Sequence, residues 1–130
     1  MSSNVELVRS IYADWERGDF RSTAWVDPGI ELVIAEGLDG DVLRGRDSAA
    51  RGWREWLSAW DGYRAHAHEY RALDGERVLV LGRMSGRGRI GGVSSETETA
   101  NIFHVRAGKV VRLALYRDRS RAFADLGLEE

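Results

Sequence analysis

The sequence of 130 residues contains no cysteine and a single proline. The absence of cysteine excludes disulfide bonds, thiolate nucleophiles and cysteine-based metal sites. No stretch approaches the ~20 consecutive apolar residues of a membrane-spanning helix, and the N-terminal segment lacks the apolar run of a signal peptide. We therefore expect a cytoplasmic protein with no membrane partner.

An excess of charge of one sign is also missing. The 19 basic and 21 acidic residues give a net charge of −2, so the sequence has no basic stripe of the kind that nucleic-acid-binding proteins use. His66 and His68 alternate on an expected strand, but no clustered carboxylates complete a ligand set. We expect one domain over residues 1–130, with no nucleic acid, no metal and no cofactor bound.

Helical patterns dominate the first half of the chain. Ser3 and Glu6 form a capping box, and Gly18 ends the helix that follows. A short second helix is expected from Asp19 to about Trp25. A third begins at a cap on Asp47 and carries an apolar stripe as far as Trp60. A short C-terminal helix is expected between Asp118 and Gly127.

The strand patterns fall mostly in the second half. Ile30, Leu32 and Ile34 alternate, and the glycine-rich segment 37–41 predicts a hairpin that returns through 42–44. Four further strands are expected at 63–72, 76–89, 96–105 and 109–116. Because strands follow one another instead of alternating with helices, the order predicts an α+β fold with an antiparallel sheet.

Four short motifs add a family resemblance: Arg17-Gly18-Asp19, Leu43-Arg44-Gly45-Arg46-Asp47, Arg106-Ala107-Gly108-Lys109 and Tyr116-Arg117-Asp118. With these motifs in order, the chain resembles the SnoaL-like proteins of the nuclear-transport-factor-2-like superfamily. The resemblance implies a cone-shaped fold, in which three N-terminal helices cover a strongly curved mixed or antiparallel sheet and a short C-terminal helix follows. Relatives include polyketide cyclases, ketosteroid isomerases and proteins that only bind or scaffold, so the fold alone does not give a reaction.

Glu36 is the first candidate catalytic residue. It continues the apolar face of Ile30, Leu32 and Ile34, and a carboxylate in such surroundings has a raised pKa that suits a general base. The resemblance also places it where ketosteroid isomerases carry their proton-shuttling aspartate. The alternative is that Glu36 begins a solvated turn beside Gly37.

Asn101 and Tyr12 are the second and third candidates. Asn101 shares a strand face with Thr99, Phe103 and Val105, so its amide would lie among apolar walls and could stabilise an oxyanion. The resemblance matches it to the acid in the oxyanion hole of ketosteroid isomerases. The alternative is an ordinary hydrogen bond to a neighbour or to water. Tyr12 would be a second polar member of the pocket.

Apolar and aromatic side chains are expected to complete the pocket. Helical stripes of aromatic residues fit core packing, but one or two of these rings could also line a pocket and stack on a flat ligand. The predicted lining consists of Trp15, Ile34, Trp53, Trp56, Phe103, Leu113, Leu115 and Arg117.

Together these residues predict a pocket for a small apolar molecule. One hypothesis is a cofactor-independent isomerase or cyclase-type enzyme that acts on an apolar carbonyl compound by general acid-base chemistry. The alternative is a non-catalytic binding or scaffold domain, and the sequence leaves open whether a reaction occurs. A homodimer through the convex face of the sheet, which includes Ala100 and Ile102, is the expected assembly.

Overall fold

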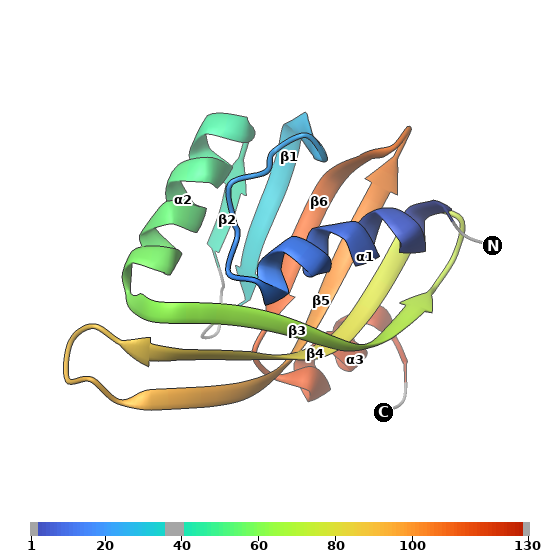
Figure 1. Cartoon of the computed structure of the whole chain (residues 1–130). Helices are drawn as coiled ribbons and strands as arrows, with labels where there is room; N and C mark the ends of the chain where they lie inside the picture. Colours follow the sequence, from blue (N-terminus) through green and yellow to red (C-terminus); the bar gives the residue numbers. More distant parts are fainter. Residues whose placement is uncertain (1–2, 36–40, 129–130) are drawn as a thin grey trace.

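The computed structural model describes residues 3–35 and 41–128, which form three helices and one six-stranded sheet. Two helices lie on the concave face of the bent sheet, and the third lies on its convex face (Figure 1). The elements are α1 (Ser3–Glu16), β1 (Val26–Ala35), β2 (Asp41–Arg44), α2 (Arg46–Ser58), β3 (Trp60–Ala72), β4 (Arg77–Gly88), β5 (Ser94–Arg106), β6 (Lys109–Tyr116) and α3 (Arg119–Leu126).

The sheet is mixed, with strand order β2-β1-β6-β5-β4-β3. All neighbouring strands run antiparallel except β1 and β6, which are parallel. A parallel pair needs a long connection, and here most of the chain lies between the two strands. The sheet therefore joins an early strand to the last one, which brings residues near positions 34 and 115 side by side.

The concave face holds the larger core, which we call the concave core. Helix α1 buries Val8, Ile11, Tyr12 and Trp15 on its contact with β3 and β4. The sheet contributes Phe103, which is fully buried. This arrangement confirms the predicted inward face of β5, because alternate side chains of a strand point to the same side.

The expected helix at 19–25 is wrong, because this segment is irregular in the structure. A helix this short is marginal unless packing supports it. Asp19 instead accepts a hydrogen bond from the backbone N–H of Arg21 at 3.1 Å, a local contact that competes with helix formation. The expectation of three N-terminal helices is therefore wrong: in the described ranges α1 precedes β1, α2 follows β2 and α3 follows β6, so the helices are spread along the chain.

The helix α2 is shifted from its predicted position. Its N-cap is Gly45 with φ 89°, a conformation that favours glycine, so Asp47 lies in the first turn and not at the cap. The helix ends at Ser58, and Trp60 opens β3 by pairing with Gly88. A Cβ on Gly52 would lie 2.1 Å from Cδ1 of Leu43, so this glycine lets α2 approach β2 closely.

Helix α3 covers a second core on the convex face. Asp118 caps it as predicted, and Gly127 ends it in the left-handed conformation. Phe123 of α3 lies over a layer that we call the convex core. It contains Val33, Leu79, Leu81, Ala100, Ala114, Tyr116 and Ala122. Ala100 is 0% exposed, so the expectation that it forms part of an outer dimer surface is wrong, because α3 and its neighbours already cover it.

Candidate functional site

An inner cavity of about 30 Å³ lies between α2 and the concave face of the sheet. Six predicted pocket residues line it: Trp15, Ile34, Trp53, Trp56, Leu115 and Arg117. Asn101 lines it as well. A space of this size holds about two water molecules, so a larger molecule would fit only if side chains of the wall moved.

Strand pairing places the centre of this site. Leu115 of β6 lies directly beside Ile34 of β1 on one side and beside Asn101 of β5 on the other. These three side chains therefore form a row across adjacent strands, although they are far apart in the sequence. Leu115 lies in the middle of this row and Asn101 at one end, so the row places an amide next to apolar side chains at the cavity wall.

Asn101 and Tyr12 form a buried hydrogen bond. The Nδ2 of Asn101 donates to the hydroxyl oxygen of Tyr12 at 2.7 Å, and the two residues are 7% and 1% exposed. The structure thus brings both predicted residues together. An amide nitrogen carries two hydrogens, so the second remains for a ligand at the inner cavity.

Tyr12 lies behind Asn101 and is not among the residues that line the inner cavity. Burial raises the pKa of its hydroxyl well above the ordinary value of 10.0, which keeps it protonated at neutral pH. The hydroxyl therefore positions the amide of Asn101 instead of contacting a ligand in the inner cavity.

Trp56 was predicted only as an aromatic lining residue, but its indole N–H also places a polar group at the cavity. Its indole Nε1 is buried and makes no hydrogen bond of ordinary geometry with any described residue. The Arg117 guanidinium lies 5.7 Å from the centre of a Trp56 ring. Burial raises the pKa of the neighbouring Tyr63 hydroxyl, while the Trp56 N–H and the Arg117 charge oppose that rise.

Besides Tyr12, two predicted pocket residues, Phe103 and Leu113, are not among the residues that line the inner cavity. Phe103 is fully buried and fills the concave core. Leu113 lines a separate, larger pocket on the other side of Trp15 and Trp53. Glu36 lies outside the described residues.

The sequence reasoning also missed five residues that line the inner cavity: Tyr63, Ala65, Met84, Thr99 and Tyr116. Alternation along the strand already placed Thr99 on the face of Asn101, which is the signal that could have found it. The same alternation along β4 places Met84 on the face of Val78 and Val80, which pack in the concave core.

Residues 3–35 and 41–128 contain neither a metal-binding cluster nor a membrane-spanning helix. No group of three or more histidine, aspartate or glutamate side chains could hold a metal ion there. No helix in these ranges is long and apolar enough to cross a membrane.

Solved structures share this fold over nearly the whole chain. An NTF2-like protein from Burkholderia thailandensis is 28% identical, with a TM-score of 0.78 over 97% of this chain and 98% of that one. TerC, crystallised with polyporic acid, is 24% identical, with a TM-score of 0.74 over 96% and 98%. A putative SnoaL-like polyketide cyclase from Jannaschia is 14% identical, with a TM-score of 0.73 over 98% and 93%.

A comparison with curated proteins finds no significant sequence match. The family model of the SnoaL-like domain matches residues 8–113, which include most of α1, all of α2 and most of the sheet. The chain therefore belongs to the SnoaL-like domain family.

Proposed function

We propose that this protein is a cofactor-independent enzyme of the isomerase or cyclase type, which acts on a small apolar carbonyl compound in the inner cavity. The observation that carries the proposal is the Asn101 amide, which lies at the cavity wall beside the apolar Leu115 and is held by the Tyr12 hydroxyl at 2.7 Å. The neighbours named as polyketide cyclases, and TerC with its bound polyporic acid, support a small-molecule pocket of this kind.

The proposed reaction begins with removal of a proton from carbon next to the carbonyl group. Glu36 is the proposed base: in the sequence pattern it follows Ile34, which lines the inner cavity, at the next position of the same face. As the C–H bond breaks, its electron pair forms an enolate, and the free amide hydrogen of Asn101 stabilises the oxygen. The Trp56 N–H is a second candidate donor.

The enolate can then react in two ways without any oxidant or reductant. In an isomerisation, protonated Glu36 returns the proton to a different carbon of the same molecule. In a cyclisation, the enolate carbon attacks a second carbonyl carbon of the substrate, and the new alkoxide takes the proton. Both routes use the same base and the same oxyanion donor.

Exchange of carbon-bound protons in D₂O tests the proposal without knowledge of the natural substrate. With cyclohexanone and 2-tetralone as probes, we expect the protein to accelerate deuterium incorporation next to the carbonyl, measured by NMR. Glu36→Gln should abolish the acceleration, and Asn101→Ala should reduce it by about 10²–10³-fold. Glu55→Gln, a change on the exposed side of α2, is the matched control and should behave like the unmodified protein.

Equal acceleration in Glu36→Gln would exclude Glu36 as the base. If neither ketone exchanges faster with the protein, but both shift the side-chain amide signal of Asn101, the site binds and does not catalyse. That second candidate function is favoured by one observation: Tyr12, the expected partner donor, does not line the inner cavity.

We further propose that the chain is a single domain, that it is cytoplasmic, and that it pairs as a homodimer through the convex face of the sheet. Ile102 remains partly exposed beside α3 and is the residue on which such a contact would depend. Sedimentation equilibrium should show a dimer that Ile102→Glu converts to a monomer. A monomer at all concentrations would contradict the dimer.

A further inference from the structure

A second pocket, which we call the outer pocket, lies between α2, β1 and the irregular segment 18–25. Its volume of about 480 Å³ is within the range of ligand pockets, about 300–1,000 Å³. Trp15 and Trp53 line both this pocket and the inner cavity, and their ring centres are 5.4 Å apart. The two indoles therefore separate the two spaces.

Aromatic rings form much of the wall of the outer pocket. Phe20 and Trp25 line it together with Trp15 and Trp53. The ring centres of Phe20 and Trp53 lie 5.9 Å apart, and those of Trp15 and Trp25 lie 6.0 Å apart, both in edge-on geometry. Rings in these orientations offer faces and edges on which a flat aromatic group packs well.

One face of α2 forms the opposite wall. Its residues follow each other at helical spacing, so they lie on the same side of the helix: Arg46, Ala49, Ala50, Trp53, Arg54 and Leu57. The small side chains of Ala49 and Ala50 leave room in the middle of this wall, and the two arginines lie about two turns apart. The helix thus combines an apolar surface with positive charge.

The charges around the outer pocket are of one sign. Three arginines and no acidic residue line it among the residues that the structure describes. Arg21 is already paired with Asp19 at 3.2 Å. Arg46 and Arg54 have no ion pair with any described carboxylate, so their charge is available to an anion.

Arg46 is held at the wall of the pocket. Its Nη2 donates to the backbone carbonyl of Val26 at 3.2 Å, and Val26 itself lines the outer pocket. A guanidinium has five N–H donors, so this single bond leaves enough of them for a carboxylate. Arg54 has no such hydrogen bond to the wall among the described residues. Arg46 is therefore the better ordered of the two positive groups.

We propose that the outer pocket is a binding site for a flat aromatic carboxylate, with the carboxylate on Arg46 and the rings between the aromatic wall and α2. An arginine fork matches the two oxygens of a carboxylate, and the surrounding apolar wall strengthens the attraction. The site is separate from the inner cavity and does not depend on the function proposed above.

The probe is 2-naphthoate, and its neutral isostere 2-naphthamide has nearly the same shape. In NMR titrations, 2-naphthoate should shift the indole N–H signals of Trp15, Trp25 and Trp53 in a saturable way. We expect 2-naphthamide to bind about tenfold more weakly, because it lacks the charge-assisted hydrogen bonds to Arg46.

Matched arginine variants test the position of the charge. Arg46→Gln should remove the preference for 2-naphthoate over 2-naphthamide, while glutamine still offers a donor to the Val26 carbonyl. Arg51→Gln, on the same helix but not among the residues lining the pocket, should leave the preference unchanged. Ala50→Trp fills the pocket and should abolish binding of both compounds.

Five results would overturn the proposal, four of which concern the compounds and the variants of α2. These four are the absence of saturable binding, equal affinities for the two compounds, loss of the preference in Arg54→Gln but not in Arg46→Gln, and unchanged binding in Ala50→Trp. Loss of binding in Ala65→Leu, which narrows only the inner cavity, would also overturn it by moving the ligand there. If Ala50→Trp does not fold, the comparison of Arg46→Gln with Arg51→Gln still decides.

Discussion

Asn101 is the residue on which the proposed chemistry of the inner cavity depends, and the Tyr12 hydroxyl holds its amide by a hydrogen bond. Both are almost completely buried, and one hydrogen bond of 2.7 Å joins β5 to α1 through them. A buried amide without a partner is costly, whereas a satisfied one has a fixed orientation. The pair is therefore important both for the fold and for the direction in which the free amide hydrogen points.

Tyr12→Phe should destabilise the protein by about 1–3 kcal/mol, because it leaves the buried Asn101 amide without its acceptor. Urea unfolding followed by circular dichroism measures the change. Tyr70→Phe is the control. The ring centres of Tyr70 and Tyr12 lie 6.1 Å apart, but the Tyr70 hydroxyl makes no hydrogen bond within the described ranges. If both variants lower the free energy of unfolding equally, the hydrogen bond to Asn101 does not contribute specifically to stability.

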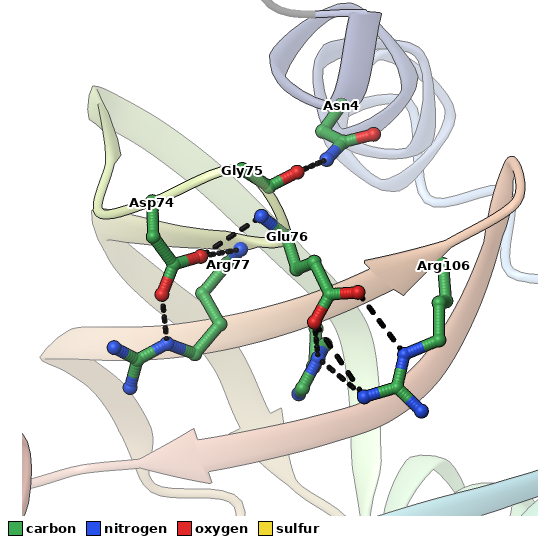
Figure 2. A network of polar contacts seen from close by, with 7 residues as sticks. Asn4, Asp74, Gly75, Glu76, Arg77 and Arg106 are labelled. Carbon is green, nitrogen blue, oxygen red and sulfur yellow. Dashed lines mark hydrogen bonds and ion pairs between the residues drawn. The ribbon is translucent and has the colours of Figure 1, made fainter.

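At the scale of elements, polar contacts at the turn between β3 and β4 attach the start of α1 to the sheet. Asn4 donates its side-chain N–H to the carbonyl of Gly75 at 2.9 Å (Figure 2). In the same turn, the carboxylate of Asp74 accepts from the backbone N–H groups of Glu76 and Arg77, and from Nε of Arg77, at 2.8 Å each. The ordered turn, through its contact with Asn4, therefore fixes the start of α1, the helix that carries Tyr12.

The next residue extends these contacts to β5. The Glu76 carboxylate accepts from Nε of Arg106 at 3.1 Å and lies 2.9 Å from Nε2 of His104. These contacts, with His104 contributing most, hold the pKa of Glu76 below its usual range. The turn is thus joined to both α1 and the strand that carries Asn101.

Stability should depend on Asp74 in acid. Hydrogen bonds from Glu76 and Arg77 lower its pKa from 3.8 to about 2, so the folded state favours the charged form. Its contribution is complete above about pH 4 and is lost as the pH falls toward 2. Asp74→Asn should therefore be less stable than the unmodified protein at pH 7, and the difference should vanish near pH 2.

Urea unfolding at a series of pH values measures this effect. Asn4→Ala is a neutral control, because it removes a neighbouring hydrogen bond but no titratable group. Its effect on the free energy of unfolding should be the same at every pH. If the difference in free energy of unfolding between Asp74→Asn and the unmodified protein stays constant from pH 7 to pH 2, the lowered pKa of Asp74 does not contribute to stability.

At the scale of the whole molecule, one sheet supports a core on each face. The concave core lies under α1 and contains Tyr12 and Phe103, whereas the convex core lies under α3 and contains Phe123. Only the concave side encloses the inner cavity and the outer pocket. The convex side, closed by α3, stabilises the curved sheet from behind.

Phe123→Ala should lower the free energy of unfolding by about 3–5 kcal/mol, because the ring is 4% exposed and its loss leaves a cavity in the convex core. The indole signals of Trp15 and Trp53 should keep their positions, since the change is on the other face. Leu128→Ala is the control: this side chain is 42% exposed, so its removal should change the free energy of unfolding by less than about 0.5 kcal/mol. Large shifts of both indole signals would show that the two cores are not separate.

Local patterns in the sequence are sufficient to predict which face of a strand or helix many side chains occupy. Alternation along β5 put Asn101 on the inward face, and helical spacing put Tyr12 and Trp15 on the inward side of α1. These inferences succeed because strand and helix geometry fix side-chain direction over a few residues. The irregular segment at 19–25 shows where local patterns fail, since short helices depend on packing.

Only the tertiary structure decides which inward side chains leave space and which fill it. Phe103, Leu113 and Leu115 all point inward, yet Phe103 fills the core, Leu113 lines the outer pocket and Leu115 lines the inner cavity. The sequence determines the face of each residue through the local geometry of the backbone. The distance to the opposite layer depends on sheet curvature and on the placement of α2, which arise from contacts between residues far apart in the chain.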